Sequence, residues 1–178
     1  VIFTGIICAS SVDDYLNGTI KIHEQTIARR EEMFKDYLGG TGFNAEPVLL
    51  TYPDHPGVDK ILSQYYDERP EYEFTTTNRS VHKLWLIQKE SDVAALQESF
   101  AEAEALYIAD GHHRSASSAL LCQQKRQENP SYTGAESFNY CMSYLIPESQ
   151  LRILDFNRLV CDLNGLEKDD LLQAISKS

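Results

Sequence analysis

The sequence has no long apolar run, no excess of basic residues and no closely spaced cysteines. Without about 18 consecutive apolar residues, it predicts no membrane-spanning helix. Lys and Arg number 16 against 27 Asp and Glu, and the net charge of −11 would repel the backbone of DNA. The first residues, VIFTG, do not form the basic leader of a signal peptide. These absences predict a cytoplasmic protein that binds neither membranes nor DNA.

The four cysteines lie far apart, at positions 8, 122, 141 and 161, and form no Cys-x-x-Cys motif. Cys8 and Cys141 belong to apolar, strand-like runs, where cysteine usually serves as a small buried hydrophobe. We therefore expect free, buried thiols. A disulfide and a redox role are the alternatives.

The composition is that of an ordinary globular domain, with 42% hydrophobic and 24% charged residues. A chain of 178 residues can bury a core without a metal or a disulfide. We expect one domain over residues 1–178. Its first residues are typical of a strand entered midway, which predicts that the domain is excised from a longer chain.

Strand-like and helix-like patterns alternate without the regularity of a doubly wound fold. The expected strands are 1–9, 19–22, 46–52, 72–76, 81–88, 105–109, 138–146 and 151–154. The expected helices run from residues 23–26 to about 38, over 58–66, from Ser91 onward, over 115–127 and from 162 to the end. Asn17-Gly18 favours a tight hairpin. This order predicts an α+β fold with a mixed β-sheet and flanking helices.

The most informative motif is Asp110-Gly111-His112-His113-Arg114, called the DGHHR turn below, between an apolar strand and a helix. Unpaired N–H groups at a helix start bind phosphates, Gly111 allows close approach, and Arg114 can add a bidentate contact. Asp110 could orient a histidine or hold Mg²⁺. The alternatives are a plain turn in which Asp110 caps the helix, and a transition-metal site on the histidines.

A second motif places His23 beside Glu24 at a strand–helix junction. A carboxylate in that position can act as the general base for a hydroxyl nucleophile. The alternative is that Glu24 lies in the first turn of the following helix, where a negative charge is favourable in any protein. The residues alone favour the second interpretation.

Together these motifs resemble the domain of unknown function 1015 family. The matching stretches are VDDYLNGTIKIHEQT, EPVLLTY, VHKLWLI, LYIADGHHRSASSAL and FNYCMSYLIPESQLRILDFNRLV. That family is similar to the ParB/sulfiredoxin-like superfamily, in which a G-x-x-R core binds the phosphates of CTP or ATP. Gly111-His112-His113-Arg114 matches this core.

Within the superfamily the chain looks most like the free-serine kinases. The resemblance implies an ATP- or ADP-dependent phosphotransferase with Mg²⁺, with CTP as another possible nucleotide. It assigns Glu24 and Asp110 to catalysis, Asp110 also to the metal, and residues 111–114 with Ser115 to the nucleotide. His23 and Arg158 are assigned to a small hydroxyl substrate such as free serine.

Two features depart from the family pattern. Family members are longer at both ends, which again predicts an excised fragment. Many members have a histidine where this chain has Asn157, beside Arg158.

The alternative function is a nucleotide-dependent binding or switch module of the ParB-like chromosome-partitioning type, without small-molecule catalysis.

Overall fold

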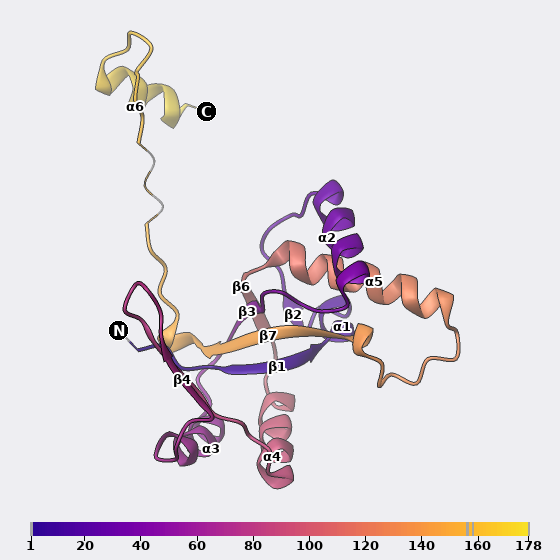
Figure 1. Cartoon of the computed structure of the whole chain (residues 1–178). Coiled ribbons are helices and arrows are strands. Elements are labelled where there is room, and N and C mark those ends of the chain that lie inside the picture. Colours follow the sequence, from indigo (N-terminus) through magenta and orange to yellow (C-terminus); the bar gives the residue numbers. More distant parts are fainter. Residues whose placement is uncertain (1, 156, 158, 178) are drawn as a thin grey trace.

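A computed structural model describes residues 2–155, 157 and 159–177. It contains a five-stranded sheet, whose strands are seen in Figure 1. The order across the sheet is β1-β7-β3-β6-β2. The strands are β1 (Ile6–Ser11), β2 (Ile20–Lys21), β3 (Val48–Tyr52), β6 (Leu106–Asp110) and β7 (Tyr140–Pro147). A separate two-stranded hairpin comprises β4 (Tyr72–Thr75) and β5 (Val81–Leu84).

The sheet is mixed, which confirms the predicted α+β class. β7 pairs antiparallel with β1 and parallel with β3, while β6 pairs antiparallel with β3 and parallel with β2. The central strands are the most apolar, and Val48, Leu50 and Ile108 are each 1% exposed. Val48 and Leu50 are two residues apart on β3, and Leu50 pairs with Ile108, so these three side chains share one buried face of the sheet.

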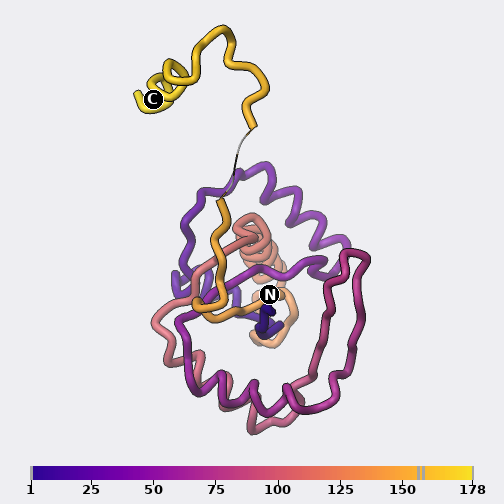
Figure 2. The backbone as a smooth tube through the Cα atoms, turned by 90° about the vertical axis from the view of Figure 1, so that its left-hand side faces the viewer, coloured from indigo at the N-terminus to yellow at the C-terminus, as the bar shows by residue number. Residues whose placement is uncertain are grey.

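Helices cover both faces of this sheet (Figure 1). On one face, α2 (Ala28–Thr41) packs against α5 (His112–Glu128), and α1 (Val12–Leu16) also contacts α5. On the other face, α3 (Pro56–Tyr66) packs against α4 (Glu90–Ala101). The last helix, α6 (Lys168–Ser176), lies away from the sheet (Figure 2). None of the helices in the described part of the chain has the length and apolarity to cross a membrane.

The hairpin predicted at Asn17-Gly18 is wrong, because β1 and β2 lie at opposite edges of the sheet. The chain turns into α1 directly after β1, and the hydroxyl of Ser11 accepts a hydrogen bond from the backbone N–H of Asp13. Gly18 then adopts a positive φ of 81°. The local Asn-Gly signal marks the end of α1 rather than a strand reversal.

Several other element boundaries differ from the expected ones: β1 begins only at Ile6, β5 already ends at Leu84, and the last helix begins at Lys168. Three further differences concern residues near the candidate site or a whole strand. α2 begins at Ala28, so residues 23–26 belong to a loop. α5 begins at His112, three residues before the expected start. Residues 151–154 form no strand. The shifts of α2 and α5 change the surroundings of the candidate site residues.

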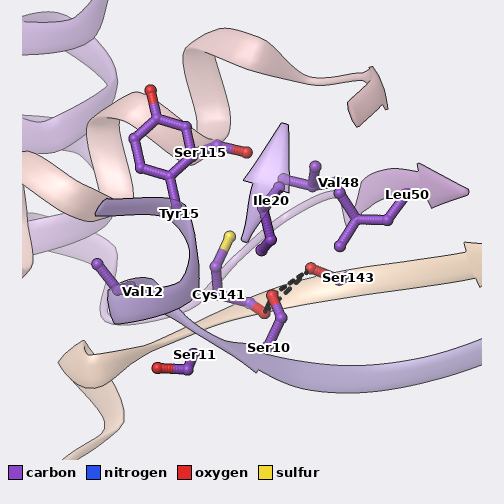
Figure 3. Close-up of a pocket in the computed structure, with 10 residues that line it drawn as sticks. All are labelled: Ser10, Ser11, Val12, Tyr15, Ile20, Val48, Leu50, Ser115, Cys141 and Ser143. Carbon is purple, nitrogen blue, oxygen red and sulfur yellow. Dashed lines mark hydrogen bonds between the residues drawn. The ribbon is translucent and has the colours of Figure 1, made fainter. Parts of the chain in front are cut away.

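A small cavity lies between the sheet and the α5 side of the core (Figure 3). Its volume is about 10 Å³, the scale of a single water molecule. Ser10 and Ser143 face one another there, with their hydroxyl oxygens 2.7 Å apart. Ser115 of α5 also lines this cavity. Its side chain therefore faces the sheet.

The cysteines are all free, as expected. Cys122 and Cys141 are buried, Cys8 is half-buried and Cys161 is exposed. Burial, together with the nearby Cys141, raises the pKa of the Cys8 thiol to about 11. This thiol is therefore protonated at neutral pH and acts as a packing residue.

Candidate functional site

The DGHHR turn joins the end of β6 to the start of α5. Gly111 is the N-cap residue and has a φ of 99°, a conformation that glycine adopts without strain. No side chain caps the helix, and its first turn contains no acidic residue. The first helical hydrogen bond runs from Ser115 N to Gly111 O, at 3.0 Å. The backbone N–H groups of residues 112–114 precede it and lie at the positive end of the helix dipole.

Asp110 does not cap the helix, contrary to the plain-turn alternative. Its carboxylate instead accepts a hydrogen bond from Nη2 of Arg114 at 2.7 Å. Nη1 of the same guanidinium donates to Glu46 at 2.9 Å. Nε of Arg114 is buried without a partner among the described residues. The guanidinium thus joins two carboxylates, and its buried Nε–H makes no hydrogen bond to a described residue.

Arg114 also lies directly over Gly111. A Cβ atom added to Gly111 would lie 2.9 Å from Nη2 and 3.0 Å from Nε of Arg114. Glycine therefore suits this position by its backbone conformation, and a side chain here would also require the guanidinium to move.

Glu24 and His112 approach one another although they lie in different parts of the sequence. Nδ1 of His112 is 3.7 Å from a carboxylate oxygen of Glu24, and Nε2 of His23 is 4.0 Å from the other. The rings of His23 and His112 meet edge to face, with centroids 4.4 Å apart. The two sequence motifs therefore form one cluster.

His112 differs from its neighbours in burial. Its side chain is 5% exposed, against 60% for His23 and 67% for Glu24. Burial, followed by the proximity of His23, lowers the pKa of His112, and the carboxylates of Glu24 and Asp110 only partly oppose this. The imidazole is thus neutral near pH 7, and its buried Nε2 has no partner within the described part of the chain.

Glu24 is not in a helix, so the first-turn interpretation of its charge is wrong. It lies in the loop before Ala28, and Glu31 is the acidic residue in the first turn of α2. Its carboxylate instead lies 3.7 Å from Nδ1 of His112.

A cleft of about 520 Å³ opens at this end of α5. Residues from the loop before α2, from α2, from the segment before β3 and from the start of α5 line it. They are Glu24, Arg30, Phe34, Tyr37, Leu38, Phe43, Asn44, Ala45, Glu46, Asp110, Gly111, His112, His113, Arg114, Ser117 and Ser118. The volume is within the range of small-molecule sites.

The structure brings most of the predicted site residues to this cleft. Glu24 and the whole DGHHR turn line it, and His23 is adjacent through its contact with Glu24. Ser115 is the exception, because its side chain lines the internal cavity and its backbone N–H is bonded to Gly111. Arg158 lies outside the described residues, and Asn157 is exposed in an irregular segment.

One group of side chains has the composition of a metal site. Ligand atoms of His23, Glu24 and His112 all lie within 4.8 Å of one another. Ligands of a tetrahedral zinc ion are about 3.3 Å apart, so the exposed His23 and Glu24 would have to move inward. His113 is not in this group, so of the two adjacent histidines only His112 contributes to it.

The sequence did not single out Glu46 or the aromatic residues of α2. Glu46 precedes β3, which runs antiparallel to β6 with Leu49 opposite Asp110. The start of β3 therefore lies beside the end of β6, which brings Glu46 to Arg114. Only knowledge of the strand pairing could have predicted this contact.

The comparisons with known proteins identify the family. The model of the family described as "Protein of unknown function (DUF1015)" matches residues 1–178. No curated protein and no solved structure matches the chain. The match spans the chain, both motifs included, and the chain belongs to the DUF1015 family.

Proposed function

We propose that the chain binds a nucleotide with Mg²⁺ and transfers a phosphoryl group from ATP or ADP to a small hydroxyl compound such as free serine. The observation that carries the proposal is the uncapped N-terminus of α5, which lines the cleft beside Gly111 and Arg114. Three N–H groups and a guanidinium converge there, a combination suited to phosphate. A ParB/sulfiredoxin-like architecture and a cytoplasmic location are parts of the same proposal.

The charges at the turn make this binding dependent on a divalent cation. Arg114 contributes one positive charge, whereas Asp110 and Glu46 contribute two negative ones. The carboxylates would repel a phosphate unless a cation offset them. Mg²⁺ supplies this charge when bound, and Asp110 and Glu46 are oxygen ligands of the kind it prefers. Arg114 would then be free to turn its donors, including the unpaired Nε, toward the phosphate.

Glu24 is the proposed base for the acceptor hydroxyl. It would take the hydroxyl proton while the oxygen bonds to the terminal phosphorus, and the bond from that phosphorus to the bridging oxygen breaks. ADP leaves when ATP is the donor, and AMP leaves when ADP is the donor. The neutral imidazole of His112, 3.7 Å from Glu24, can orient the carboxylate without neutralising it.

Phosphorus NMR of mixtures containing the chain, Mg²⁺, serine and either ATP or ADP tests the proposal. We expect phosphoserine to form with the wild type and to be lost with Glu24→Gln, while the variant still binds nucleotide. Glu104→Gln, an exposed carboxylate between α4 and β6, is the control and should retain turnover. Unchanged turnover in Glu24→Gln would remove Glu24 from the mechanism.

Nucleotide binding without turnover of any hydroxyl compound would favour the alternative of a nucleotide-dependent switch module. Gel-shift assays at low salt with and without CTP would then test for DNA binding. The net charge of −11 predicts no shift.

A further inference from the structure

One wall of the cleft is aromatic. Phe34 and Tyr37 of α2, with Phe43 just after the helix, line the cleft and are 37%, 48% and 57% exposed. Leu38, half-buried, lines the same cleft. Positions 34, 37 and 38 are three and four residues apart, so they share one face of α2. These four residues are called the aromatic wall below.

The exposure of this wall is unusual for the inner side of a packed helix. α2 packs against α5, yet none of its residues is buried. Its aromatic side chains therefore leave much of their surface uncovered. Rings in this situation are suited to cover a planar ligand, because stacking buries apolar area on both partners.

The wall begins next to the DGHHR turn. The ring of Phe34 lies 6.5 Å from that of His113, with a 46° angle between the ring planes. His113 is the second residue of α5, so the aromatic surface adjoins the helix terminus where phosphates are proposed to bind. A molecule that contacts both must carry a phosphate at one end and an apolar planar group at the other.

We propose that the aromatic wall binds the nucleobase of the nucleotide whose phosphates lie at the DGHHR turn. The inference rests on the proposed function and adds the place and character of base recognition. Stacking tolerates any base but increases with ring area, which favours purines over pyrimidines. Arg30 and Asn44, which line the same cleft, offer hydrogen-bonding groups at the edge of a stacked base.

Calorimetric titration with three probes tests this inference: MgATP, magnesium tripolyphosphate and adenosine. Wild type should bind MgATP at least about tenfold more tightly than tripolyphosphate, because only ATP reaches the wall. Tyr37→Ala should weaken MgATP about tenfold and leave tripolyphosphate unchanged. Tyr37→Leu keeps the apolar bulk without the ring and should show a base-specific loss in the same direction.

Tyr72→Ala is the matched control, because Tyr72 is also a largely exposed tyrosine but lies in the β4–β5 hairpin. It should alter none of the three titrations. Equal affinities for MgATP and tripolyphosphate, both unaffected by Tyr37→Ala, would refute base binding by the aromatic wall and would still support the phosphate site. Adenosine binding that is lost in Tyr37→Ala, with no binding of tripolyphosphate, would support base binding by the aromatic wall and refute the phosphate site. Failure of all three probes to bind would overturn both.

Discussion

Gly111→Ala tests whether the guanidinium of Arg114 lies where the structure places it. An alanine at φ 99° carries the cost of a left-handed conformation, about 1–2 kcal/mol. The new Cβ would also lie 2.9 Å from Nη2 of Arg114 and force the guanidinium to move. This movement disrupts the hydrogen bonds to Asp110 and Glu46, and exposed pairs of this kind contribute about 0.2–1 kcal/mol each.

Gly18→Ala separates these two contributions. Gly18 also has a positive φ, of 81°, but nothing lies within 4 Å of an added Cβ. Its substitution should therefore cost only the backbone term. We expect Gly111→Ala to lower the free energy of unfolding by about 1 kcal/mol more than Gly18→Ala does.

A double-mutant cycle measured by urea denaturation completes the experiment. In an Arg114→Ala background no guanidinium opposes the new methyl group, so Gly111→Ala should cost no more than Gly18→Ala. The two substitutions at the turn should then be non-additive by about 1 kcal/mol. Additive effects within about 0.3 kcal/mol would refute the placement of Arg114 over Gly111.

Three other properties follow from the structure. Ile108→Ala should lower the free energy of unfolding by about 2–5 kcal/mol in urea denaturation, because the side chain is 1% exposed in a central strand. Hydrogen bonds from the backbone N–H groups of Thr133 and Gly134 lower the pKa of Glu136 to about 2. The ionised carboxylate of Glu136 therefore stabilises the fold above its unfolded pKa of about 4.5, and this stabilisation is lost as the pH falls toward 2. Between these pH values the unfolding midpoint of Glu136→Gln should depend less on pH than that of the wild type. Titration of native thiols at pH 8 should label the exposed Cys161 first, and Cys161→Ser should lose this fast phase; equal rates for all four cysteines would contradict the observed burial.

Most of the fold could be predicted from local patterns. The strands β3, β6 and β7 are recognisable as apolar runs, and α3 and α5 follow helical spacing. Pairing could not be predicted, because it depends on contacts between distant segments. Asn17-Gly18 illustrates this limit: the turn signal is real, but the chain that follows it crosses to the other edge of the sheet.

The candidate site could be predicted only in part, because some of its features are local and others depend on contacts between distant segments. The DGHHR turn is a local feature, and its glycine indicates the backbone conformation that the structure shows. The side of α5 that a residue faces depends on the exact start of the helix. The start at His112 places Ser115 toward the sheet, whereas the expected start left its direction open. The contacts of Glu46 and the aromatic wall required the packing of the whole domain.

The central claim is that the DGHHR turn holds the phosphates of a Mg²⁺-bound nucleotide. Calorimetric titration of wild type and Arg114→Ala with ATP, ADP and CTP, with Mg²⁺ and again with EDTA, tests it most directly. We expect binding only with Mg²⁺, weakened in Arg114→Ala by about 1.5–3 kcal/mol and unchanged in Arg69→Ala, an exposed arginine just after α3. Binding that Arg114→Ala leaves unchanged, or no binding of any nucleotide, would contradict the account.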